Sequence, residues 1–362
     1  MNKIESLSTE GRNPNSMNLD QVSTLEMVEI INNEDAKVAA GITVALPKIA
    51  KAIDLAAERF AAGGRIIYIG AGTSGRLGLL DGVELTPTYS VPAERAFGII
   101  AGGAEAVYKA IEGAEDSREL GLADIKAVEL TPQDILIGLS ASGRTPYVLA
   151  ALEYAKKVGA LTISVSANPN SEMAAVADVG IDVAVGPEVI TGSTRMKSGT
   201  AQKMVLNMIS SGIMVRTGKV YQNLMINVQA TNEKLVNRGI RIVSQATGVS
   251  FEEAEKVFYE AGERVNVAIL MLELNISSTE AKKLLEEKAS DIFTMLEAAV
   301  VREDTPGFAA FYMENQDSQT VWGGTIDDVE EVTSSSLYDL ASLTKVVGTT
   351  TRILQLIDHE EI

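Results

Sequence analysis

The stretch Arg65-Ile-Ile-Tyr-Ile-Gly-Ala-Gly-Thr-Ser-Gly-Arg76 decides the fold of this chain. It opens with a short apolar run rich in isoleucine, which is typical of a strand buried on both faces of a sheet. The glycines and hydroxyl side chains that follow are typical of a tight turn leading into the N-terminus of a helix. The stretch therefore predicts a strand, a polar loop and a helix in succession.

Four more apolar runs follow, separated by stretches in which apolar residues have helical spacing. The runs lie at residues 96–101, 134–139, 161–165 and 180–185. Strands that alternate with helices form parallel sheets whose faces are covered by the helices. Residues 45–218 are therefore predicted to form a three-layer α/β domain with a parallel sheet.

The regions on either side of this domain have different patterns. Residues 1–44 are predicted to form an N-terminal arm and helix. Residues 219–300 contain helical patterns only, with capping boxes that begin at Ser250 and Ser277, and predict a small all-helical domain. Residues 301–362 form a further segment with 12 acidic and 3 basic residues, which is half of the net charge of the chain.

The composition of the chain excludes several classes of protein. Its formal net charge of −18 argues against a nucleic-acid binder, because phosphate backbones are held by clustered Lys and Arg. The N-terminal residues lack the apolar run of a signal peptide, and no stretch approaches the ~20 apolar residues that span a bilayer. We expect a cytoplasmic protein with no nucleic-acid or membrane partner.

The chain contains no cysteine, and its single histidine is His359. Thiol nucleophiles, disulfides and thiolate metal sites are therefore absent, and the main domains work without imidazole. Ser-His-Asp triads and His-based metal sites are excluded there. We expect no metal, with Asp, Glu, Lys, Tyr and Arg as the candidate proton carriers.

The first polar loop, at residues 70–76, matches the G-x-G-x-x-G pattern of dinucleotide-binding proteins. Those proteins place an acidic residue about twenty positions further on, after the next strand, to bind the ribose. Here Glu94 precedes its strand, so we prefer a sugar phosphate as the ligand. The candidate binding residues are Gly72, Thr73 and Ser74, and a tight turn without a ligand is the alternative.

The second polar loop, Ser140-Ala-Ser-Gly-Arg-Thr145, is followed by Pro146, which is suited to the first turn of a helix. A helix N-cap needs one hydroxyl, whereas this loop offers three around a glycine. The excess favours several donors that converge on a phosphate over simple capping. The predicted phosphate-binding residues are Ser140, Ser142, Gly143 and Thr145.

The third polar loop, Thr191-Gly-Ser-Thr-Arg-Met-Lys-Ser198, leads into a predicted helix. Its hydroxyls and the cations Arg195 and Lys197 are suited to an anionic substrate. A capped helix start with solvated charges explains the same residues equally well. Ser193 and Lys197 are the candidate substrate contacts, and both interpretations stay open.

Two groups of carboxylates complete the candidate chemistry, Asp81-Gly-Val-Glu84 and Glu112-Gly-Ala-Glu-Asp116. Acidic residues on helices are usually solvated, and we assign that role to Glu112, Asp116 and Glu119. The remaining candidates for catalysis are Glu84 and Glu115.

The three polar loops resemble those of SIS (sugar isomerase) domains, which bind phosphosugars at turns rich in Ser and Thr. Longer strings resemble the N-acetylmuramic acid 6-phosphate etherases, a family with this domain, over residues 4–290. The strings are Leu25-Glu-Met, Ile30-Ile-Asn-Asn-Glu-Asp35, Gly70-Ala-Gly-Thr-Ser-Gly-Arg-Leu-Gly78, Glu112-Gly-Ala-Glu-Asp-Ser-Arg-Glu119, Ala141-Ser-Gly-Arg-Thr-Pro-Tyr147, Thr191-Gly-Ser-Thr-Arg-Met-Lys197 and Ala230-Thr-Asn-Glu-Lys-Leu235.

The resemblance implies that Glu84 and Glu115 are catalytic, in a site without metal or nucleotide cofactor. It implies release of D-lactate from N-acetylmuramic acid 6-phosphate to give N-acetylglucosamine 6-phosphate. Glu84 would donate a proton to the departing lactate and then activate water, and Glu115 would be the base at C2 of the ring-opened sugar. The family often has Asp-Ala-Ser-Glu where this chain has Asp81-Gly-Val-Glu84, which retains the glutamate.

A continuous helix from Ser74 to Glu84 would separate Glu84 from the first loop by roughly 15 Å, which a hexose phosphate hardly spans. Either the helix breaks at Gly78 or Gly82, or the site is completed across a subunit interface, as the resemblance to a dimeric family implies. We expect a homodimer.

Two alternative functions stay open. A sugar-phosphate isomerase would share the phosphate loops and a glutamate base but would release no lactate. A non-enzymatic phosphosugar sensor would bind without turnover and would have little need for both Glu84 and Glu115.

The string Tyr338-Asp-Leu-Ala-Ser-Leu-Thr-Lys345 resembles the Ser-x-x-Lys motif of serine beta-lactamases and related esterases. The resemblance implies Ser342 as the nucleophile and Lys345 as its activator. The Tyr-x-Asn and Lys-Thr-Gly motifs of that fold are absent from residues 346–362. We therefore expect a truncated beta-lactamase-like segment that is inert in acylation.

Overall fold

The computed structural model describes residues 8–230, 232–286, 307–314, 317–326 and 330–331. The chain divides into two compact units, residues 1–266 and residues 267–362. The first unit contains a parallel sheet together with all of the predicted catalytic and substrate-binding residues.

The sheet has five parallel strands in the order β2-β1-β3-β4-β5, which confirms the predicted α/β class. The strands are β1 (Ile66–Gly70), β2 (Ala96–Ile100), β3 (Ile135–Leu139), β4 (Leu161–Ser166) and β5 (Val179–Asp182). The last strand ends three residues before the apolar run that predicted it, because its pairing stops where Asp182 lies opposite Ser166 at the end of β4.

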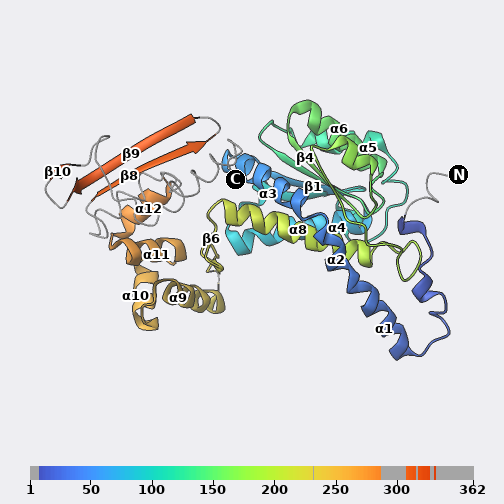
Figure 1. Ribbon diagram of the computed structural model, residues 1–362, viewed down its shortest axis with the longest axis horizontal. Helices are drawn as coiled ribbons and strands as arrows, with labels where there is room; N and C mark the ends of the chain where they lie inside the picture. Colours follow the sequence, from blue (N-terminus) through green and yellow to red (C-terminus); the bar gives the residue numbers. More distant parts are fainter. Residues whose placement is uncertain (1–7, 231, 287–306, 315–316, 327–329, 332–362) are drawn as a thin grey trace, which may run out of the picture. The chain divides into compact units, whose positions relative to one another are not determined.

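Helices cover both faces of the sheet. Side chains alternate along each strand, so these apolar strands present apolar side chains on both faces, and both must be buried. In β1, Ile66 and Tyr68 belong to one buried cluster, and Ile67 and Ile69 belong to another. Figure 1 shows α4 and α8 on one side of the sheet and α5 and α6 on the other. The helices around the sheet are α3 (Leu46–Ala61), α4 (Gly72–Tyr89), α5 (Arg118–Ala127), α6 (Pro146–Val158), α7 (Glu172–Val176) and α8 (Lys197–Arg216).

Glycines inside α4 allow the helix to lie close to the sheet. A Cβ atom on Gly78 would lie 2.7 Å from Cβ of Tyr68, and one on Gly82 would lie 3.1 Å from Cα of Phe97. The helix runs without a break through both glycines. The predicted alternative of a break at Gly78 or Gly82 is therefore wrong, because these glycines serve close packing and not a turn.

The first unit contains further elements before, within and after the sheet domain. The first unit also contains η1 (Ser8–Glu10), η2 (Pro14–Ser16), α1 (Thr24–Asp35), α2 (Lys37–Thr43), η3 (Ala93–Arg95), η4 (Ala104–Val107), β6 (Val220–Tyr221), β7 (Leu224–Met225), α9 (Glu233–Thr247) and α10 (Phe251–Glu260). The hairpin of β6 and β7 interrupts the region predicted to be helical only. Strands of two residues leave no periodic pattern in a sequence.

The second unit contains most of α11 (Val265–Leu274) and all of α12 (Ser278–Glu286). It also contains an antiparallel sheet of β8 (Gly307–Glu314), β9 (Asp317–Ile326) and β10 (Glu330–Glu331). The Ser342 and Lys345 motif predicted to resemble a beta-lactamase lies outside the described residues.

Candidate active site

The first two polar loops lie side by side at one edge of the sheet. Strands β1 and β3 are parallel neighbours, and their last residues, Gly70 and Leu139, are paired in register. The carboxyl ends of neighbouring parallel strands are where α/β proteins bind ligands. The first loop begins directly after Gly70 and the second directly after Leu139, so both open onto this edge.

Three hydroxyls converge in the second loop. The Ser140 hydroxyl lies 3.1 Å from that of Ser142 and 2.7 Å from that of Thr145, and it accepts a hydrogen bond from the Gly143 main-chain N–H at 3.1 Å. Thr145 is the N-cap residue of α6, yet its side chain makes no capping hydrogen bond. Ser140, Ser142 and Thr145 are called the hydroxyl cluster below. Their hydroxyls form hydrogen bonds with one another, and the Thr145 hydroxyl does not cap α6.

Gly143 gives the second loop its shape. Its φ angle is +70°, a conformation that side chains other than glycine disfavour. A Cβ atom at this position would also lie 2.4 Å from Cβ of Ser171. The positive φ angle and the close approach together require glycine at this position.

The predicted residues of the first loop belong to the start of α4. Gly72 is its first residue and has a φ angle of +53°, and Thr73 and Ser74 follow within the first turn. The buried Ser74 hydroxyl donates to Oε1 of Gln202 at 2.9 Å. Nε2 of Gln202 is buried and has no hydrogen-bond partner within the described part of the chain. Sequence reasoning missed Gln202, because a glutamine inside a helix is ordinarily exposed.

The third loop contributes a buried ion pair. Lys197, only 1% exposed, donates from Nζ to Oε2 of Glu34 at 2.7 Å. Burial opposes the charge of Glu34, but hydrogen bonds with Lys197, Lys37 and Asn15 outweigh burial and hold the pKa of this carboxyl well below its usual range. Ser193 lies in a turn, where its main-chain N–H donates to the carbonyl oxygen of Ile190. The geometry thus engages the Lys197 ammonium with α1, and a substrate contact by Lys197 or Ser193 stays a prediction.

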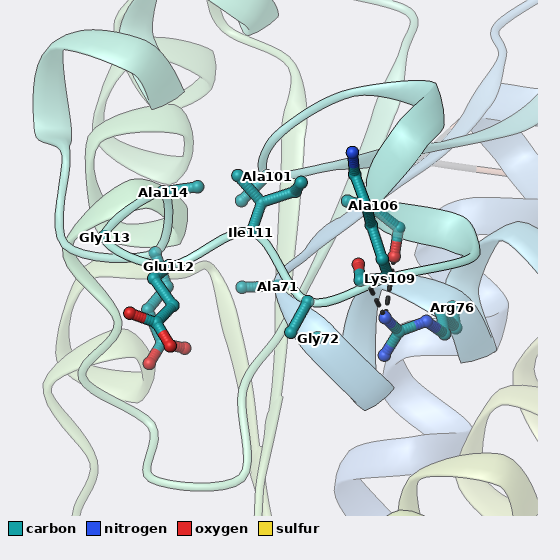
Figure 2. A pocket seen from close by; sticks show the side chains of 12 residues that line it. Ala71, Gly72, Arg76, Ala101, Ala106, Lys109, Ile111, Glu112, Gly113 and Ala114 are labelled. Atoms are coloured by element: carbon teal, nitrogen blue, oxygen red, sulfur yellow. Dashed lines mark hydrogen bonds between the residues drawn. The ribbon is translucent and has the colours of Figure 1, made fainter.

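Glu115 lies next to the hydroxyl cluster through the main chain. Its carbonyl oxygen accepts a hydrogen bond from the N–H of Tyr147, in the first turn of α6, at 3.1 Å. Its exposed side chain lines a cavity of about 310 Å³ together with Gly72 of α4. Figure 2 shows Arg76 and Lys109 on one side of this cavity and Glu112 on the other.

Arg76 holds the wall of this cavity together. Its guanidinium donates to the carbonyl oxygens of Ala106 at 2.7 Å, Val107 at 3.0 Å and Lys109 at 3.3 Å. Two of these hydrogen bonds are drawn in Figure 2. The segment that leads to Glu115 is thereby tied to α4.

Glu84 lines a different cavity, of about 280 Å³, between α4 and α8. Its neighbour Asp81 accepts hydrogen bonds from the hydroxyls of Tyr68 at 2.6 Å and Ser210 at 3.2 Å. Burial raises the pKa of Asp81 above its ordinary value. These two hydrogen bonds and the charge of Lys203 act in the opposite direction but do not outweigh burial. The structure therefore does not bring Glu84 and Glu115 into one cavity of the same chain.

Two further observations concern the described residues alone. No group of three or more His, Cys, Asp or Glu side chains is placed there to hold a metal ion. In the same part of the chain, every helix is too short or too polar to cross a bilayer.

Two protein-family models match parts of this chain. Residues 48–156 match the glucokinase regulatory protein N-terminal SIS domain, and residues 121–211 match the SIS domain. A solved structure, a putative sugar-phosphate isomerase from Listeria monocytogenes, is similar with a TM-score of 0.41 and 21% identity, over 54% of this chain and 93% of that one.

Curated relatives match over a longer range. The chain is 57% identical to N-acetylmuramic acid 6-phosphate etherase 1 of Enterococcus faecalis over 81% of this chain and 98% of the relative. It is 54% identical to the N-acetylmuramic acid 6-phosphate etherase of Clostridium beijerinckii over 81% of this chain and 97% of that relative. Because this identity extends over almost the whole length of both relatives, the chain belongs to the N-acetylmuramic acid 6-phosphate etherase family, with an SIS domain as its core.

Proposed function

We propose that this chain is a carbon–oxygen lyase that cleaves the lactyl ether of N-acetylmuramic acid 6-phosphate. The products are N-acetylglucosamine 6-phosphate and D-lactate, as in the recycling of cell-wall amino sugars. The observation that carries the proposal is the position of Glu115, whose main chain is bonded to the helix that begins at the hydroxyl cluster. A phosphate held by that cluster would keep the sugar within reach of this carboxylate, and family membership supports the choice of ether.

The reaction proceeds by elimination followed by addition of water. Ring opening exposes an aldehyde at C1, which acidifies the proton on C2. Glu115 removes that proton, the bond between C3 and the ether oxygen breaks, and Glu84 protonates the departing lactate oxygen. Glu84 then takes a proton from a water molecule while the oxygen of that water adds to C3. The proton held by Glu115 returns to C2.

A homodimer supplies both glutamates to one site. The α4 helix separates Glu84 from Ser74 of the first loop by roughly 15 Å along its axis. One chain therefore does not present both Glu84 and the first loop to the same hexose phosphate. Leu80 and Val83, which precede Glu84 by four residues and one residue in α4, are 51% and 66% exposed. A second subunit that covers this apolar surface would place its own hydroxyl cluster opposite Glu84.

The direct test is incubation of the protein with N-acetylmuramic acid 6-phosphate, with D-lactate measured by a coupled dehydrogenase. We expect one D-lactate for each N-acetylglucosamine 6-phosphate formed. Conversion of a sugar phosphate without lactate would favour an isomerase. Binding without any turnover would favour a sensor.

A further inference from the structure

The cavity beside Glu84 contains donors that the elimination does not use. Lys203 and Asn207 reach it from α8, opposite Asp81 and Glu84 of α4. Residues four apart on a helix lie on the same face, so the ammonium of Lys203 and the amide of Asn207 serve one region of the cavity. Leucine side chains complete the lining, from Leu77, Leu80 and Leu206.

The charge of Lys203 is available to a ligand. Lys203 is exposed and forms no ion pair within the described residues. The nearby carboxylate of Asp81 is already held by two neutral hydroxyls, one on each oxygen. The cavity therefore offers one cation and one amide donor to an incoming anion, next to the group proposed to protonate lactate.

We propose that this cavity binds the lactyl group, with Lys203 and Asn207 holding its carboxylate; this inference rests on the proposed function. The ether that breaks carries a three-carbon unit with a methyl group and a carboxylate. The leucines are suited to the methyl group, and the two donors from α8 are suited to the carboxylate. A substrate carboxylate in this cavity would lie near the carboxylate of Asp81, and the cation of Lys203 offsets that negative charge.

The assignment gives the two α8 residues a role in specificity. A sugar phosphate without the lactyl group has no carboxylate for them to bind. A site with donors for a group rejects an analogue that lacks it, because the donors stay unpaired. Lys203 and Asn207 would then distinguish N-acetylmuramic acid 6-phosphate from other sugar phosphates that the hydroxyl cluster accepts.

The test compares two substrates with three variants. The substrates are N-acetylmuramic acid 6-phosphate and its analogue in which the lactyl carboxylate is replaced by a neutral carboxamide. The variants are Lys203→Met, which removes the charge at similar length, Lys203→Arg, which keeps it, and Lys51→Met, a matched control on the exposed surface of α3.

We expect Lys203→Met to lower kcat/KM for the natural substrate about 10- to 100-fold, the range of a lost charge-assisted hydrogen bond. On the carboxamide, Lys203→Met and the unmodified protein should be equal. Lys203→Arg should keep most of the activity on the natural substrate, and Lys51→Met should match the unmodified protein on both.

Two results would overturn the assignment. One is an equal loss on both substrates, which would give Lys203 a role unrelated to the carboxylate. The other is an unchanged kcat/KM of Lys203→Met on the natural substrate. Neither can be confused with failure of the proposed function, in which the unmodified protein itself releases no D-lactate. Thermal unfolding of each variant checks that this exposed substitution leaves the fold intact.

Discussion

A substitution at Thr145 can distinguish a capping role from a role in phosphate binding. It occupies the N-cap position of α6 but bonds to Ser140 and makes no bond to the helix end. Thr145→Val keeps the shape and removes the hydroxyl. We expect KM for N-acetylmuramic acid 6-phosphate to rise at least ~10-fold, with a loss of about 1 kcal/mol in the free energy of unfolding.

A true cap provides the control for Thr145. The Ser250 hydroxyl accepts from the N–H of Glu253 at the start of α10. Ser250→Ala should cost about 1 kcal/mol of stability and leave KM unchanged. Steady-state kinetics and urea unfolding of both variants make the comparison, and an unchanged KM in Thr145→Val would remove the hydroxyl cluster from the substrate site.

Glu34 determines a pH dependence of stability. Its pKa lies below the ordinary value of 4.5, so its charge stabilises the fold fully above about pH 4.5 and less as the pH falls toward the depressed pKa. Glu34→Gln leaves the buried Lys197 ammonium without its counter-charge and should cost roughly 3 kcal/mol at pH 7.

The difference between Glu34→Gln and the unmodified protein should shrink as the pH is lowered from 5 to 3, as measured by denaturant unfolding across about that interval. Glu29→Gln, at an exposed position of the same helix, should stay within about 0.5 kcal/mol of the unmodified protein. A difference independent of pH would show that the charge of Glu34 does not stabilise the fold.

At the scale of elements, the packing of α4 on the sheet depends on glycine. Gly78→Ala would improve helix propensity by about 1 kcal/mol. Its methyl group would nevertheless lie 2.7 Å from Cβ of Tyr68 and 3.0 Å from Cδ1 of Leu139. We expect the clash to dominate, with a net loss of about 2 kcal/mol in the free energy of unfolding measured in urea. Lys51→Ala, at an exposed helix position, is the control and should leave the free energy of unfolding nearly unchanged. A Gly78→Ala variant whose free energy of unfolding is unchanged or increased would contradict this packing.

The sequence predicted the strands and helices themselves better than the contacts between them. The runs of β1 and β3 predicted buried strands, because unbroken apolar runs and the turn residues that follow them are visible in the sequence. Gly78 and Gly82 were ambiguous, since a glycine that ends a helix and one that packs against a strand are the same letter. Their neighbours Tyr68 and Phe97 settle the matter, and that contact exists only after folding.

At the scale of the whole molecule, the proposed shared site predicts complementation. Glu84→Gln and Glu115→Gln should each be nearly inactive alone. After the two are mixed and allowed to exchange subunits, half of the dimers contain both variants, and one of their two sites is intact. Lactate release should therefore recover to roughly a quarter of the unmodified rate. Mixed samples that exchange subunits, as checked by native mass spectrometry, but stay inactive would show that each site is built from one chain.

The sequence by itself determined the parallel α/β class, the hydroxyl-rich loops and the resemblance to the etherases, because periodicity, turn chemistry and motif strings are local properties. Tertiary structure decided which of these residues meet. Lys197 pairs with Glu34 across 163 positions, and Lys203 shares a cavity with Glu84, because α8 packs against α4 and lies near the end of α1. Such contacts depend on how helices pack in space, and no spacing along the chain records that packing.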